Sequence, residues 1–241
     1  MLQKTSGIIL KTTKYSENSL IVKIYTQKFG LQSYIINGIR NKKSKNKISA
    51  FQSLSIIDLE VIHSEKKTLQ RITEINSHYS FVDIPFNIIK TSICIFINEI
   101  IYKTIKEEHS DSDLYDFLTH SLYTLDVSKE NGANFPILFL IQFSKYLGFY
   151  PQGEYTDIDN YFDLQEGQFV STTPMHTYYI QKELSIHLNQ FLKSDFKNYS
   201  FISINNTNRR KLLDMMIEFY TLHIHGFGEI KSHKVLEEII N

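Results

Sequence analysis

The sequence predicts an α+β protein in which a five-stranded β-barrel of the OB type precedes an all-helical domain. Two observations support this fold class. Residues 6–78 are rich in β-branched side chains and alternate between apolar and polar positions, with no helix-length pattern among them. From Asp83 onward, apolar residues recur every three or four positions, which is the spacing of helices that bury one face. We therefore expect two domains, residues 1–80 and residues 81–241.

Five segments of the first domain have the period of a β-strand. Gly30 can adopt a positive φ, so a turn is expected between the second and third segments. A count of five fits a closed or partly open OB barrel, and it also fits an SH3-like barrel. The expected strands are residues 7–13, 19–26, 31–39, 57–61 and 69–77.

The second domain is expected to contain six helices and one small β-hairpin. Residues 110–113 supply an N-cap for the second helix, and Gly148 ends the third. Residues 149–176 form a polar, acidic insertion in which residues 162–170 are expected to make the hairpin. The expected helices are residues 86–100, 114–125, 135–147, 177–191, 206–224 and 234–240.

Charge is distributed unevenly along a chain whose formal net charge is zero. Residues 1–80 hold 13 Lys and Arg against 5 Asp and Glu, a net charge of +8, and the remainder carries −8. The N-terminal domain is therefore the part expected to meet a polyanion.

A basic stretch, residues 38–47, joins two expected strands and contains no acidic residue. A basic loop between the strands of a small barrel is suited to holding a phosphate backbone, although it can also be a plain solvated loop. The residues expected to contact DNA here are Arg40, Lys42, Lys43, Lys45 and Lys47. A second candidate surface is the barrel face that carries Lys11, Lys14 and Lys23. Tyr25 and Tyr34 lie near basic residues and are candidates for stacking on bases, or for packing in the core.

The sequence favours no catalytic or metal site. Cys94 is the only cysteine and lies in an apolar run, so we interpret it as an inert thiol. Phosphate-binding glycine loops and nucleophile-elbow motifs are absent. His223 and His225 are two positions apart and would point in different directions on a helix. The chain is therefore expected not to be an enzyme, to bind no cofactor and no zinc, and, lacking a signal peptide or membrane span, to be cytoplasmic.

The chain resembles the RecO family of bacterial recombination mediators along nearly its whole length. The segments that show the resemblance are residues 7–19 with 26–30, the Gly-x-Arg loop at 38–44, the weaker match at 147–151, and residues 209–232, which are the most specific. The resemblance implies binding of single- and double-stranded DNA and annealing of complementary strands. It also implies help, together with RecR, in loading the recombinase onto DNA coated with single-strand-binding protein, and location at the nucleoid when bound to DNA.

The resemblance further implies that the helical domain receives the acidic, apolar tail of single-strand-binding protein. The expected basic partners of that tail are Arg209, Arg210, Lys211, Lys231 and Lys234. Many family members carry a four-cysteine zinc module where this chain has residues 151–178, which contain no cysteine. Aromatic packing by Tyr155, Tyr161, Phe162 and Phe169 is expected to replace the metal. Two alternatives remain open at this point: an OB-fold RNA-binding protein, and a non-catalytic adaptor whose basic loop docks an acidic protein.

Overall fold

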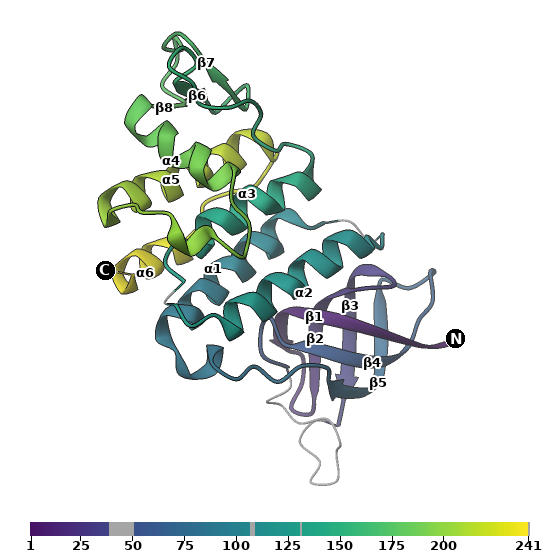
Figure 1. The fold of residues 1–241 in the computed structure, drawn as a ribbon. Coiled ribbons are helices and arrows are strands. Elements are labelled where there is room, and N and C mark those ends of the chain that lie inside the picture. Colours follow the sequence, from purple (N-terminus) through teal and green to yellow (C-terminus); the bar gives the residue numbers. More distant parts are fainter. Residues whose placement is uncertain (39–50, 107–108, 131, 241) are drawn as a thin grey trace. The chain divides into compact units, whose positions relative to one another are not determined.

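The computed structural model describes residues 1–38, 51–106, 109–130 and 132–240 (Figure 1). The chain divides into two compact units. One combines residues 1–82 with 98–123, and the other combines residues 83–97 with 124–241. The sequence-based boundary at residue 80 stays a prediction.

The first unit contains the expected five-stranded closed barrel, with the strand order β1-β2-β3-β5-β4. All neighbouring strands pair antiparallel except β3 and β5, which are parallel. The strands are β1 (Leu2–Lys14), β2 (Ser19–Thr26), β3 (Gly30–Asn37), β4 (Ile56–Ile62) and β5 (Leu69–Ser77). Strand β1 begins earlier than expected, because residues 2–6 continue the pairing with β4.

Aliphatic side chains fill the barrel interior. Val22, Ile24, Val61 and neighbouring residues are fully or almost fully buried, in agreement with their period of two. Each fully buried side chain of this size contributes about 1.5–3 kcal/mol relative to an exposed one. Gly7 allows a close approach, because a Cβ at this position would lie 2.6 Å from a methyl group of Ile24.

The helices confirm the change of period after residue 82, with one correction. They are α1 (Ile88–Thr104), α2 (Ser112–Val127), α3 (Phe135–Leu147), α4 (Lys182–Leu192), α5 (Asn206–His223) and α6 (Ser232–Ile239), with short 3₁₀ turns η2 (Ile84–Phe86) and η3 (Tyr199–Phe201). Asp111 caps α2 by accepting a hydrogen bond from the Leu114 N–H, and Gly148 ends α3 in the left-handed conformation. The expected helix start at residue 177 is wrong, because Tyr179–Ile180 forms strand β8 before α4 begins.

The insertion is consequently a three-stranded sheet of order β7-β6-β8 rather than a simple hairpin. Its other strands are β6 (Tyr161–Asp163) and β7 (Gln168–Val170). Phe162 packs edge-on against Phe169, with ring centroids 5.1 Å apart, and also contacts Phe219 of α5. Aromatic packing therefore holds these strands together, as expected for Phe162 and Phe169.

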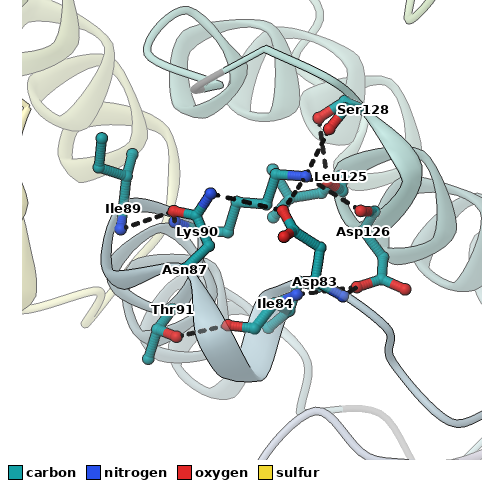
Figure 2. Close-up of polar contacts among 9 residues, drawn as sticks. All are labelled: Asp83, Ile84, Asn87, Ile89, Lys90, Thr91, Leu125, Asp126 and Ser128. Carbon is teal, nitrogen blue, oxygen red and sulfur yellow. Dashed lines mark hydrogen bonds and ion pairs between the residues drawn. The ribbon is translucent and has the colours of Figure 1, made fainter.

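Lys90 of α1 is fully buried, and its ammonium group is surrounded by oxygen atoms of the second unit (Figure 2). Its Nζ lies 2.7 Å from Asp83 Oδ2 and donates to the main-chain oxygens of Asp126 and Ser128 at 3.0 and 2.6 Å. These oxygens lie at the C-terminus of α2, where carbonyl groups lack helical partners. The Asp126 carboxylate in turn accepts from the N–H groups of Asp83 and Ile84. The network joins the start of α1 to the end of α2.

Two further observations concern the helices. Burial raises the pKa of the Cys94 thiol to about 12, so that the group is protonated at neutral pH.

Among the residues that the structure describes, no helix combines the length and the apolar character needed to cross a membrane.

Candidate nucleic-acid interface

The outer face of strands β1 and β2 carries two lysines directly opposite each other. The register of the two strands pairs Lys11 with Lys23. Side chains of directly paired residues project from the same face of a sheet, with Cβ atoms about 5 Å apart. Lys11 is exposed and Lys23 is partly exposed. Like charges at such a position destabilise a sheet unless a further group compensates them.

Tyr102 of α1 compensates both charges. Its ring centroid lies 5.1 Å from Lys11 Nζ and 5.4 Å from Lys23 Nζ, so both ammonium groups make cation–π contacts with one ring. Tyr102 belongs to residues 98–123, the helical part of the compact unit that contains the barrel. Within the described part of the chain, neither lysine forms an ion pair with a carboxylate. We refer to Lys11, Lys23 and Tyr102 as the lysine–tyrosine cluster.

The face formed by β4 and β5 has the opposite character. Glu60 and Glu74 pair across the two strands, and Asp58 lies in the same sheet opposite Asn76. Lys4 lies 2.8 Å from Glu60, so its charge is locally neutralised. The acidic residues of β4 and β5 thus lie among basic ones, Lys4 and the exposed Arg71, whereas Lys11 and Lys23 have no carboxylate partner among the described residues.

Tyr25 and Tyr34, the aromatic residues considered for base stacking, are unsuitable for that role. They are exposed by only 1% and 0%, since the first packs against Tyr115 and the second fills the barrel interior. Tyr15, which follows β1 beside the exposed Lys14, is 64% exposed. The alternation of apolar and polar residues does not show which side of a strand faces the barrel interior. That depends on how the strands pair when the barrel closes.

The five basic residues of the predicted DNA-binding loop lie outside the described residues. Arg40, Lys42, Lys43, Lys45 and Lys47 fall within residues 39–50. The chain leaves β3 at Asn37 and re-enters the described part at Phe51, which is buried in the barrel core. The assignment of this loop to DNA contact stays a prediction, as does that of Lys11, Lys14 and Lys23.

The basic residues predicted to bind a protein tail differ in their surroundings. The Arg209 guanidinium donates to Asn134 Oδ1, Asn206 Oδ1 and the Ile204 carbonyl oxygen, and burial lowers its pKa. It therefore holds the start of α5 in place. Arg210 donates to the Glu237 main-chain oxygen of α6.

The three lysines of that set are more accessible. Lys211, Lys231 and Lys234 are exposed, and Lys234 lies 3.5 Å from Glu229. Lys211 lines an open groove of about 520 Å³ between β8, α4 and α5, whose apolar walls include Ile180, Leu184 and Met215. Glu183 also lines this groove, so Lys211 is balanced by one carboxylate there. The structure does not bring Lys231 and Lys234 into the lining of this groove.

The insertion offers no tetrahedral set of zinc ligands. His176 is the only Cys or His in residues 151–178, and its Nε2 lies 3.2 Å from Asp163 Oδ2. Asp163 also accepts hydrogen bonds from the N–H groups of Gln165 and Glu166 at the turn. No cluster of three or more candidate ligands occurs within the described ranges. His223, the other histidine of interest, stacks on Phe149 and contacts the Leu164 carbonyl oxygen.

A closed five-stranded barrel of this strand order belongs to the OB-like class of folds, which many nucleic-acid-binding proteins share. Comparison with known families is more specific. Residues 1–81 match the family model "Recombination protein O N terminal", and residues 85–233 match "Recombination protein O C terminal". The chain belongs to the RecO family.

Relatives of the same length support this assignment. The chain is 34% identical over 241 residues to the DNA repair protein RecO of Azobacteroides pseudotrichonymphae, and 35% identical over 242 residues to that of Bacteroides fragilis, with full coverage of each chain. It is 36% identical over 244 residues to the DNA repair protein RecO of Flavobacterium psychrophilum, with 99% of each chain covered. Membership of this family supports a role in DNA repair and recombination.

Proposed function

We propose that this chain is a non-catalytic DNA-binding mediator of recombination that binds single- and double-stranded DNA and anneals complementary strands. The observation that carries the proposal is the pair Lys11 and Lys23, held side by side on the barrel with no carboxylate partner among the described residues. The same domain contains five further basic residues, which lie outside the described part of the chain: Arg40, Lys42, Lys43, Lys45 and Lys47. Lys14 adds a further exposed charge at the end of β1.

The proposed mechanism is electrostatic. Lysine and arginine side chains neutralise phosphates and release condensed counterions, which favours binding. Neutralised strands repel each other less, so two complementary strands can approach and pair. Phosphate contacts carry no direct sequence information, so binding is expected to be independent of sequence. No bond is made or broken by the protein, whose place is the bacterial cytoplasm at the nucleoid.

The first experiment is equilibrium binding to a plain DNA oligomer over a range of salt concentrations. The proposal requires affinity to fall steeply with salt, and equally for unrelated sequences of the same length. Salt-independent or absent DNA binding would favour a protein-docking adaptor. Competition between matched DNA and RNA oligomers separates the proposal from an RNA-binding function, because an RNA-binding protein would strongly favour RNA.

The proposed protein partners are RecR and the acidic tail of single-strand-binding protein, with which the chain helps to load recombinase onto coated DNA. The groove beside Lys211 supports the second partner through its apolar walls and through the exposed Lys211 ammonium, although Glu183 in the same lining opposes an acidic tail. Arg209, Arg210, Lys231 and Lys234 remain in the proposed set, although the contacts of Arg209 give it a structural task as well.

Replacing Lys211, Lys231 and Lys234 with Gln is expected to weaken binding of a fluorescent tail peptide by about tenfold. Each exposed cation removed from a peptide site costs roughly 0.5 kcal/mol of charge-assisted bonding, and the three together about 1.4 kcal/mol. The matched control replaces Lys182, Lys193 and Lys197, which are lysines of the same unit outside the predicted set. Equal weakening by both triple variants, or by neither, would exclude this assignment.

We also propose that the insertion is stable without zinc, since the residues present do not fit a tetrahedral site. Metal analysis of untagged protein is expected to find less than about 0.1 zinc per chain, and a chelator is expected to leave thermal unfolding unchanged. One zinc per chain, removable with loss of stability, would contradict this.

A further inference from the structure

We propose that Tyr102 is a positioning residue of the nucleic-acid interface, which holds Lys11 and Lys23 in the geometry that receives phosphate groups. The proposal rests on the proposed DNA binding and extends it to a helical residue that lies outside the barrel strands. Nothing in the local sequence around Tyr102 indicates such a task. The contact exists only because residues 98–123 and the barrel form one compact unit.

Lys11 and Lys23 are directly paired across β1 and β2, so their ammonium groups repel each other and would diverge in the absence of a third group. The Tyr102 ring attracts both through its negative face, at 5.1 and 5.4 Å from the two nitrogens. A ring that attracts both ammonium groups restricts two flexible side chains before any ligand arrives, which lowers the entropy cost of binding.

Tyr102 lies near the C-terminus of α1, in the part of the helix that belongs to the same compact unit as the barrel. The next helix of the same unit, α2, contacts the barrel through Tyr25 of β2. The Tyr25 hydroxyl donates to the Asp111 main-chain oxygen at 3.3 Å, and the Tyr25 ring lies 6.4 Å from that of Tyr115. Tyr25 is buried and lies two residues from Lys23 on the same strand. Strand β2 thus carries one of the lysines and also contacts the start of α2, within the compact unit that includes Tyr102.

The ring of Tyr102 is only partly exposed and already contacts two cations. A base that stacked on this ring would have to displace those cations from the surface that binds the phosphates. Tyr102 therefore acts on DNA through the lysines and does not contact a base itself.

The test is a thermodynamic cycle of single-stranded DNA affinities at low salt. Tyr102→Leu removes the ring but no charge, and we expect about fivefold weaker binding with a salt slope close to that of the wild type. Tyr102→Phe keeps the ring face and is expected to bind within about twofold of the wild type. The double variant Lys11→Gln/Lys23→Gln is expected to flatten the slope by roughly 1.4 units, or about 0.7 for each phosphate that is no longer neutralised.

The decisive comparison is Tyr102→Leu in the Lys11→Gln/Lys23→Gln background. In that background both ammonium groups that Tyr102 contacts are missing. If Tyr102 acts only through them, the added Tyr102→Leu substitution should leave DNA affinity unchanged. A further fivefold loss in that background, or no loss in the wild-type background, would overturn the proposal. Circular dichroism and thermal unfolding confirm that each variant is folded.

A matched control comes from another cation–π pair of the chain. Lys182 Nζ lies 5.3 Å from the ring centroid of Tyr161, a geometry close to that at Tyr102, in the acidic insertion. Tyr161→Leu is expected to leave DNA affinity unchanged. Failure of the wild type to bind DNA would refute the proposed function itself, whereas normal binding by Tyr102→Leu would refute only the role of Tyr102.

Discussion

Replacing Lys42, Lys43, Lys45 and Lys47 with Gln is expected to flatten the salt dependence of single-stranded DNA binding by roughly 3 units. The reason is counterion release. In a plot of the logarithm of the binding constant against the logarithm of salt concentration, each neutralised phosphate contributes about −0.7 to the slope. With Arg40 included, the loop accounts for a slope of about −3.5 if it contacts five phosphates. Affinity should fall by a similar factor for every sequence, and strand annealing should fail in parallel.

The control for this variant replaces four other exposed lysines, which keeps the total charge of the two proteins equal. Lys66 and Lys67 lie in the β4–β5 turn, and Lys193 and Lys197 follow α4. This second quadruple variant is expected to retain nearly the whole slope. If the loop variant is folded and its slope is unchanged, the DNA surface lies elsewhere, and Lys11, Lys14 and Lys23 on the barrel become the primary contacts.

Lys90→Met is expected to destabilise the protein by about 3 kcal/mol, the largest stability effect of any single substitution considered. Removing one partner of a buried ion pair typically costs about 3–5 kcal/mol, and the lower end applies because Asp83 is half exposed and can be solvated. The Asp126 and Ser128 carbonyl oxygens would also be without this donor in a buried site (Figure 2). For a chain of this size, the midpoint of thermal unfolding should fall by roughly 6–12 °C.

Lys193→Met is the matched control, because Lys193 forms its pair with Glu154 at the surface. Such a pair contributes only about 0.2–1 kcal/mol, so the midpoint should change by less than about 4 °C. Equal stability of the two variants would show that the buried ammonium is not needed to join α1 to α2. DNA affinity of folded Lys90→Met should remain that of the wild type, since no residue of this network belongs to the lysine–tyrosine cluster or to the compact unit that contains it.

The barrel could be predicted from sequence because its determinants are local. The alternation of Val22 and Ile24 with Lys23, together with the turn at Gly30, defines β2 and the start of β3. The helix start at residue 177 was wrong for a physical reason: Tyr179 and Ile180 are compatible with either period, and pairing with β6 decides between them. A strand of two residues is too short to show a period, so the sequence pattern cannot identify it.

The polar contacts could not be predicted because they join segments far apart in the chain. Lys90 interrupts an apolar run and would ordinarily be placed on a solvated helix face, yet it caps a helix 36 residues away. Lys11, Lys23 and Tyr102 meet only after the barrel closes and the C-terminal part of α1 packs on it. Charge asymmetry shows that the N-terminal part of the chain is basic, but it could not reveal the ring that two of its lysines contact.

The most direct test of the central claim is the annealing of complementary DNA strands coated with single-strand-binding protein, followed by fluorescence as the purified chain is added. We expect the chain to accelerate annealing at low salt without nucleotide hydrolysis or strand cleavage, to lose this effect as salt rises, and to lose it in the loop variant while the control quadruple variant retains it. A folded wild-type protein that binds DNA but leaves the annealing rate unchanged at every salt concentration would contradict the claim.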